Sequence, residues 1–188
     1  MDPNADSSPD HFLLTLPYKM VQGKEILVDI YVPKSNPACR DRLASVVYFH
    51  GGGLTVGNRK AWIPFWLLRR MHPAGIVFIS PDVRLIPPGT AHDILEDIID
   101  LFKFLSTQAN DLIVRLDPHT LAVVGTSGGS LCAYLAAMHA SPKPKALLSM
   151  YGLGGNFFVS KTVSPPYHGP NACEAHVLTN TFGRTLYT

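Results

Sequence analysis

One stretch limits the possible folds of this chain more than any other. In it an apolar run ends in a turn made of glycines, a threonine and a serine. Residues 121–124 read LAVV, residues 125–129 read GTSGG, and residues 131–138 read LCAYLAAM. The pattern predicts a buried strand, a sharp turn and a helix. Glycines two residues before and after Ser127 let the backbone turn without side-chain clashes, so we expect an outward-facing hydroxyl. By itself the pentapeptide is equally compatible with an ordinary turn that joins a strand to a helix.

A second glycine-rich turn follows another apolar run. Residues 45–49 read SVVYF, the pattern of a strand buried on both faces, and residues 50–53 read HGGG. Consecutive glycines are expected where backbone amides approach a ligand closely or where φ is positive. A phosphate-binding loop is the competing interpretation, but Asn58 stands where the Walker pattern needs lysine. An anion site lined by amides therefore fits this turn better.

The remaining apolar runs alternate between strand-like and helix-like patterns. We expect strands at 12–19 and 25–32 (joined as a hairpin), 75–80 and 146–151, and helices at 61–71 and 91–106. Strands that alternate with helices predict βαβ units, so the fold class is α/β with a mostly parallel sheet covered by helices on both faces. The domain organisation expected is a disordered segment at 1–10, the α/β domain at 11–151, and an irregular tail or partial lid at 152–188.

Three groups of side chains need an interpretation. Four carboxylates at helical spacing are more typical of a solvated acidic face than of a metal site, with Arg84 as a partner for Glu96 or Asp97. The aromatic residues of 61–71 are more typical of core than of a pocket wall. Asp82, which follows a proline, favours a turn. The acidic and aromatic residues in question are Asp93, Glu96, Asp97 and Asp100, and Trp62, Phe65 and Trp66.

Composition narrows the class of protein. The 188 residues are enough for one domain with a core, and a formal charge of +2 gives no field that favours nucleic acid. The three cysteines, Cys39, Cys132 and Cys173, have no CxxC spacing, which favours reduced thiols over disulfides or zinc. The start MDPNADSSPD lacks the pattern of a signal peptide, and no apolar run approaches 18 residues. We expect a soluble, cytoplasmic protein without stable membrane insertion; nothing in the sequence indicates its oligomeric state.

The two glycine-rich turns, together with DVRL at 82–85 and the pair Glu96-Asp97, resemble the α/β-hydrolase fold family, specifically its hormone-sensitive-lipase-like carboxylesterase branch. The resemblance covers roughly residues 11–155 and implies a serine hydrolase of small esters that uses no cofactor or metal. It implies that Ser127 is the nucleophile and that the developing oxyanion is held by amides. The residues implied for the oxyanion hole are Gly52, Gly53 and Gly128, and those for the supporting motifs are His50, which braces its loop, Gly51, Gly125 and Gly129.

The chain departs from the family pattern after Ser127. The family triad runs serine, acid, histidine, yet no aspartate follows position 127, and Glu174 is the only glutamate there. His176 lies two residues from Glu174, His168 precedes it, and His139 lies twelve residues along the helix from Ser127, so none is a good base. We therefore expect a C-terminally truncated domain that lacks the last strands, with an exposed strand edge at 146–151 and impaired esterase activity. The alternative is a non-catalytic binding protein for small ligands on the same fold, like the plant gibberellin receptor.

Overall fold

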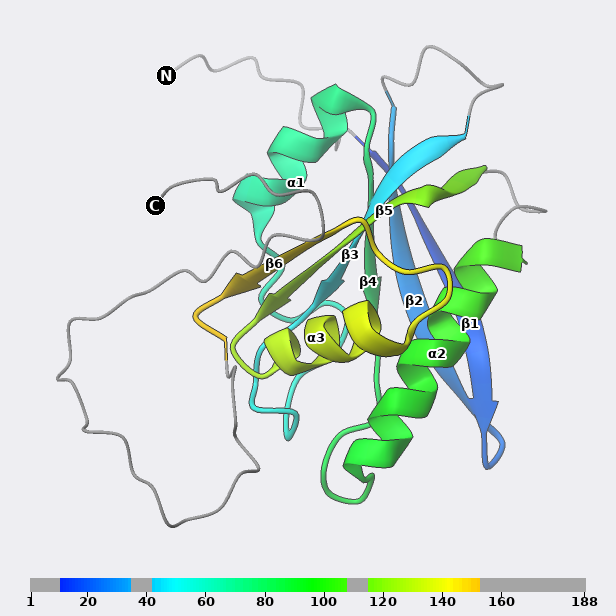
Figure 1. Ribbon diagram of the computed structural model, residues 1–188, viewed down its shortest axis with the longest axis vertical. Coiled ribbons are helices and arrows are strands. Elements are labelled where there is room, and N and C mark those ends of the chain that lie inside the picture. The colour runs from blue at the N-terminus through cyan, green and yellow to red at the C-terminus, as the bar shows by residue number, and fades with distance from the viewer. Residues whose placement is uncertain (1–10, 35–41, 108–114, 153–188) are drawn as a thin grey trace, which may run out of the picture.

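Six strands form one twisted sheet in the order β1-β2-β4-β3-β5-β6 within the described residues, which are 11–34, 42–107 and 115–152 of a computed structural model (Figure 1). The β1–β2 hairpin forms as predicted, with Gln22 and Gly23 in the left-handed region. β1, β2 and β4 pair antiparallel, whereas β4, β3, β5 and β6 are parallel, so the sheet is mixed. The strands are β1 His11–Val21, β2 Lys24–Pro33, β3 Leu43–Phe49, β4 Val77–Pro81, β5 Leu116–Thr126 and β6 Ala146–Met150.

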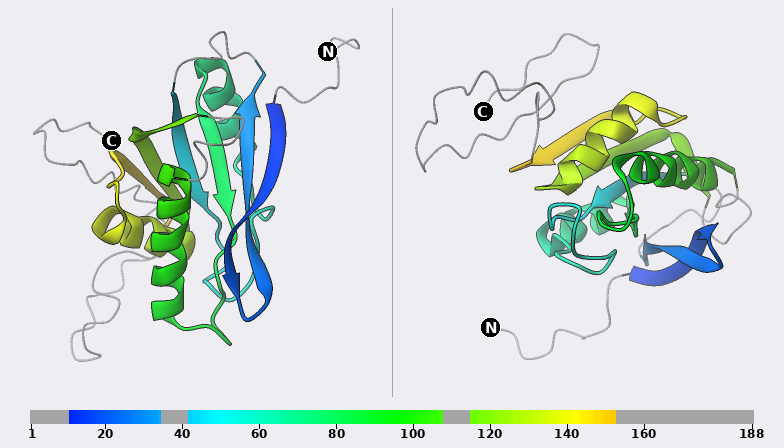
Figure 2. Two further views of the ribbon diagram at one scale, coloured as in Figure 1. Left: turned by 90° about the vertical axis from the view of Figure 1, so that its right-hand side faces the viewer. Right: turned by 90° about the horizontal axis from the view of Figure 1, so that it is seen from below.

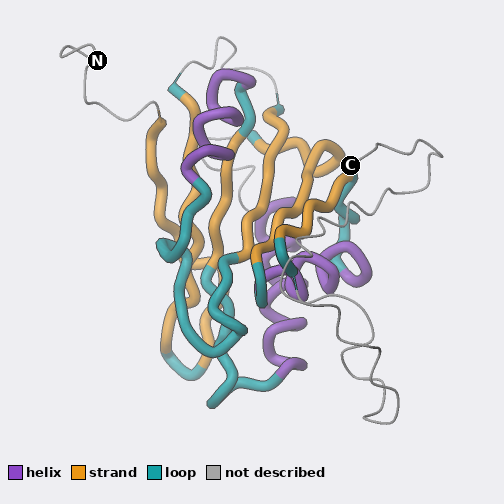
Figure 3. Tube along the Cα trace, turned by 90° about the vertical axis from the view of Figure 1, so that its left-hand side faces the viewer, coloured by secondary structure: helices purple, strands orange, loops and turns teal. Residues whose placement is uncertain are grey.

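Helices cover both faces of the sheet, as the alternating pattern predicted. α1 (Phe65–Met71), followed by the short 3-10 turn η1 (His72–Ala74), packs on one face, and α2 (Ala91–Thr107) and α3 (Gly129–His139) pack on the other (Figures 2 and 3). The core is therefore divided by the sheet. On the α1 side it contains Tyr48, Leu67, Leu68, Phe78 and Val124; on the other side it contains Val47, Ile79, Ile98, Leu101, Val123 and Ala133, among others.

The region before α1 differs from its prediction. The helix begins at Phe65 instead of position 61, because Pro64 is in a non-helical conformation and Trp62 has a φ of +51°. The expectation that Trp62, Phe65 and Trp66 belong to the core is wrong, since these side chains are 60%, 60% and 53% exposed. α1 instead turns Leu67 and Leu68 toward the sheet.

β6 is the last strand on its side of the sheet among the described residues, so its outer edge is unpaired there, as predicted. The expectations for residues 1–10 and for the tail from 153 onward lie outside the described residues, as do Cys39 and Cys173. No helix in the described parts of the chain is both long enough and apolar enough to cross a membrane.

Candidate active site

Ser127 stands at the turn between β5 and α3, where the backbone is in an unfavourable conformation. Its φ is +49°, which places a non-glycine residue in the left-handed region. The turn is held by hydrogen bonds from the Ser127 amide to the Met150 carbonyl (3.0 Å) and from the Ser130 amide to the Ser127 carbonyl (3.1 Å). Such a conformation persists only where its surroundings fix it, and it is characteristic of functional sites. The strand, turn and helix predicted around Ser127 are thus confirmed.

The glycines on either side of Ser127 are required by packing. A β-carbon on Gly125 would lie 2.6 Å from the Cα of Ser130, and one on Gly129 would collide with the carbonyl groups of Phe49 and His50. Backbone atoms cannot move aside as a flexible side chain can. The pattern of two glycines separated by three residues therefore permits both the sharp turn and the close approach of β3.

The two glycine-rich turns meet beyond the C-terminal ends of β3 and β5. These are neighbouring parallel strands, with Phe49 opposite Gly125, so the turns that follow them lie at the same end of the sheet (Figure 1). A β-carbon on Gly128 would lie 2.8 Å from both the Cα and the nitrogen of Gly53. One on Gly51 would lie 3.5 Å from the Cβ of Ser127. The serine and the glycine loop are thus in direct contact.

Three backbone amides at or next to this contact are candidates to bind an anion. Within the described residues the backbone N–H groups of Gly52, Gly53 and Gly128 donate no hydrogen bond. Gly52 and Gly53 have φ values of +94° and +62°, which turn the loop sharply. Gly128 directly precedes the 11-residue helix α3, whose N-terminal dipole also favours negative charge. The arrangement can receive an anion or a developing oxyanion.

His50 lies inside the glycine loop and is only 5% exposed. Its Nδ1 is 2.7 Å from the carbonyl oxygen of Gly51, and a β-carbon on Gly57 would lie 2.6 Å from the same nitrogen. The ring of Trp62 stands beside it, with ring centroids 6.3 Å apart. The His50 imidazole therefore fills the interior of the loop, which accords with a bracing role for this residue.

Ser127 Oγ forms no hydrogen bond within residues 11–34, 42–107 and 115–152. His139 ends α3 at the far end from Ser127, in agreement with the helical distance expected from sequence. Glu174, His168 and His176 lie outside the described residues. The structure therefore brings together the nucleophile candidate and the amides, and the part of the chain that it describes places no general base beside them.

A cluster of ion pairs formed by Arg59, Asp29 and Asp82, here called the Arg59 cluster, is not apparent from the sequence. Arg59 binds Asp29 of β2 (Nε to Oδ1, 2.9 Å) and Asp82, which follows β4 (Nη1 to Oδ2, 2.8 Å). Asp82 does not lie in a turn, contrary to its prediction, and instead pairs with this cation. The only sequence signal is the alternation in β2, which places Asp29 among residues of a buried strand. Its partner lies 30 residues away, beyond the reach of any local pattern.

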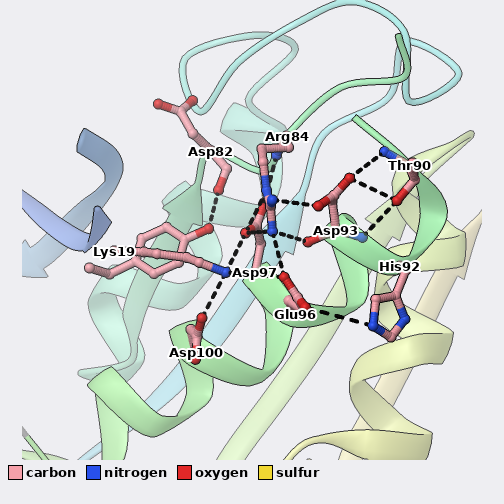
Figure 4. A network of polar contacts seen from close by, with 10 residues as sticks. Lys19, Asp82, Arg84, Thr90, His92, Asp93, Glu96, Asp97 and Asp100 are labelled. Carbon is pink, nitrogen blue, oxygen red and sulfur yellow. Dashed lines mark hydrogen bonds and ion pairs between the residues drawn. The ribbon is translucent and has the colours of Figure 1, made fainter. Parts of the chain in front are cut away.

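The predicted solvated acidic face on α2 is wrong for Asp97, which is fully buried. Arg84 donates hydrogen bonds to Asp97 and Glu96, as anticipated, and also pairs with Asp93 (Figure 4). Lys19 of β1 adds a second cation, 2.9 Å from Asp97 and 2.7 Å from Asp100. This network, distinct from the Arg59 cluster, joins α2 to the hairpin and to the segment after β4. Among the described residues no group of histidine, cysteine and acidic side chains is suited to hold a metal ion.

Comparison with known proteins agrees with this fold. The alpha/beta hydrolase fold family matches residues 46–186. A probable carboxylesterase of Phoma sp. is 31% identical over 71% of this chain and 45% of its own length. An ethyl acetate hydrolase of Pseudomonas putida is 34% identical over 66% of this chain and 38% of its own. An esterase of Thermogutta terrifontis, solved with butyrate bound, superposes with a TM-score of 0.65 at 20% identity, over 83% of this chain and 59% of that one.

The chain therefore belongs to the α/β-hydrolase fold family, and the carboxylesterase and the ethyl acetate hydrolase named above support its carboxylesterase branch. It spans less than half the length of the two relatives and about three fifths of the esterase structure. The fold class predicted from sequence is confirmed, with the qualification that the sheet is mixed.

Proposed function

We propose that this protein is a carboxylic-ester hydrolase in which Ser127 is the nucleophile and the amides of Gly52, Gly53 and Gly128 form the oxyanion hole. The observation that carries the proposal is the contact between Gly128 and Gly53, where amides of two turns that donate no hydrogen bond to any described residue lie close to Ser127. Carboxylesterase relatives support the reaction class.

In the proposed reaction, Ser127 Oγ attacks the carbonyl carbon of a small ester. A carbon–oxygen bond forms, and the carbonyl electron pair moves onto the oxygen, where the amides would stabilise its negative charge. Collapse of this intermediate breaks the bond to the alcohol, which leaves with a proton. Water then attacks the acyl group on Ser127, releases the carboxylic acid and returns the proton to the serine.

The proton of Ser127 needs an acceptor, and the described residues place none beside it. We infer that these 188 residues hydrolyse esters weakly, through oxyanion stabilisation and binding alone. Enzymes stripped of their triad retain about 10³- to 10⁴-fold acceleration over water by these means. An ester with a good leaving group is therefore the appropriate first substrate.

The test uses the 188-residue chain with p-nitrophenyl acetate and, separately, a fluorophosphonate probe, followed by peptide mass mapping. We expect nitrophenolate release above the buffer rate, with the acetyl or phosphonyl group on the peptide that contains Ser127. In Ser127→Ala the adduct should be lost, whereas release through attack of water at the amides should persist. Absence of an adduct in the unmodified chain, or the same amount of adduct in Ser127→Ala, would overturn the proposal. Tight binding of a small ester without turnover would instead support the binding-protein alternative.

A further inference from the structure

The loop from His50 to Pro64 carries two of the proposed oxyanion amides in an unfavourable backbone conformation. Besides its glycines, Leu54 and Trp62 have positive φ values of 64° and 51°. A non-glycine residue in this region costs of order 1–3 kcal/mol and persists only where surrounding contacts over-determine it. Something must therefore hold this loop in place.

Arg59 is fixed to the sheet through both its backbone and its side chain. Its amide donates to Asp82 Oδ1 (2.7 Å), and its carbonyl accepts the hydroxyl of Ser80 (2.7 Å). Its guanidinium donates to Asp29 Oδ1 and Asp82 Oδ2. The loop is thereby attached to β2, to β4 and to the segment after β4 through one residue.

Burial makes these contacts strong. The Asp29 side chain is fully buried and that of Arg59 is 15% exposed. Asp29 Oδ1 also accepts the hydroxyl of Thr15 (2.7 Å), whereas Asp29 Oδ2 has no partner among the described residues. Removal of the guanidinium would leave a charge inside the protein without its counterion, a state that proteins avoid by rearrangement.

A displacement of Arg59 would be transmitted to the oxyanion amides. Gly57, two residues before Arg59, is packed so tightly that a β-carbon there would lie 2.6 Å from His50 Nδ1 and 2.8 Å from the Trp62 ring. His50 in turn contacts the carbonyl of Gly51. The Gly52 carbonyl accepts the amides of Thr55 and Val56, which closes the loop between the amides and Gly57.

We propose that Arg59, clamped between Asp29 and Asp82, is a positioning residue that sets the geometry of the oxyanion hole. This inference rests on the proposed esterase function. Because a chain without an activated serine depends on the amides for its remaining acceleration, loss of the clamp should act directly on the rate of Ser127 acylation. Misplacement by about 1 Å can slow a reaction by about 100-fold.

The experiment compares Arg59→Gln with Lys19→Gln in the full chain. Lys19 is a matched control, because its side chain is also 15% exposed and also pairs with a fully buried carboxylate, Asp97, but its partners lie on α2. Acetylation of Ser127 by p-nitrophenyl acetate is followed over a range of ester concentrations, at a temperature where both variants are folded. Hydrogen exchange of the peptide spanning Gly52 to Gly57 is measured in parallel.

We expect Arg59→Gln to lower the maximal acylation rate by about 10- to 100-fold with little change in the half-saturating ester concentration, because the oxyanion exists only in the transition state. Exchange in the Gly52 to Gly57 peptide should rise. Arg59→Lys, which keeps the charge but cannot span both carboxylates with a fork, should recover part of the rate. Lys19→Gln should change the maximal rate less than threefold and leave exchange in that peptide unaltered.

If Ser127 of the unmodified chain is not acetylated, the proposed function fails, and exchange in the loop still tests the clamp. If Ser127 is acetylated and Arg59→Gln matches Lys19→Gln in both rate and exchange, the clamp is refuted while the esterase function stands. Equal exchange in Arg59→Gln and the unmodified chain would refute the clamp in either case.

Discussion

Gly128 and Gly53 lie in contact although 75 positions separate them, since a β-carbon on Gly128 would come within 2.8 Å of the Gly53 nitrogen. Gly53 has a φ of +62°, which favours glycine in its own turn, but the local turn does not require glycine at position 128. Gly128 has a φ of −57°, which any residue adopts. The lack of a side chain at Gly128 therefore allows the two glycine-rich turns to come into contact. This contact explains why both turns occur in one site.

Replacement of Gly128 by alanine tests this contact. The helix tolerates alanine at this φ, but the methyl group must push the Gly53 backbone away, so we expect Ser127 acylation to slow by about 100-fold. Ala137→Gly on α3 is the control, because it destabilises the helix by about 1 kcal/mol without entering the site. Acetylation rates of the two variants, measured with p-nitrophenyl acetate at equal folded fraction, decide the matter. Equal rates would show that the contact has no role in the reaction.

The buried carboxylate of α2 should contribute strongly to stability. Asp97→Ala removes the partner shared by Arg84 and Lys19, and we expect the free energy of unfolding to fall by about 3–5 kcal/mol. Asp100→Ala on the same helix removes a side chain that is 43% exposed and should cost less than about 1 kcal/mol. Urea denaturation followed by circular dichroism measures both. Similar losses for the two variants would contradict the burial of Asp97.

The N-terminus of α2 should respond to acid through its capping contacts. The amide and hydroxyl of Thr90 donate to Asp93 Oδ2, and the Asp93 amide donates to Thr90 Oγ1. Hydrogen bonds from the Thr90 hydroxyl and amide hold the pKa of Asp93 below its ordinary value of 3.8. Because the pKa is lowered in the folded state, the stabilisation is present above about pH 4 and is lost as the pH falls through the folded pKa.

We therefore expect Thr90→Ala to lower the melting temperature at pH 7 and to differ less from the unmodified chain below pH 3. Thermal denaturation at both pH values tests this, with Thr107→Ala at the other end of α2 as the control. A difference that is independent of pH would mean that the cap does not act through the Asp93 carboxylate.

Cys132 should be inert in the folded protein. It is fully buried on α3, and desolvation raises the pKa of its thiol from 9.0 to about 12. The thiolate is the reactive form, so alkylation by iodoacetamide at pH 8 should be slowed at least 100-fold relative to the urea-unfolded chain. Mass mapping of the Cys132 peptide over time gives both rates. Rapid alkylation in the absence of urea would contradict this burial.

Some features could be predicted because they depend on neighbouring residues. The alternation in residues 25–32, the apolar runs before HGGG and GTSGG, and the period of 91–106 each reflect local backbone geometry, so the corresponding strands and helix were found, although β5 begins at Leu116 instead of position 121. The α1 boundary was missed because Pro64 and the unusual φ of Trp62 delay the helix. Trp62, Phe65 and Trp66 were wrongly predicted to lie in the core, because aromatic side chains are usually buried and the sequence gives no other indication of their exposure.

The sequence by itself determined the class of fold and the candidate nucleophile, since a glycine-flanked serine after a buried strand can be recognised from nine consecutive residues. Tertiary structure alone decided which charges are buried. Asp97 looks solvated on a helix, and Asp29 looks like a single polar residue in a strand. Both are nevertheless buried and paired with cations from other parts of the chain, Asp97 with Lys19 and Arg84 and Asp29 with Arg59. Burial and ion pairing depend on which segments meet in space, and that information is absent from any short window of the sequence.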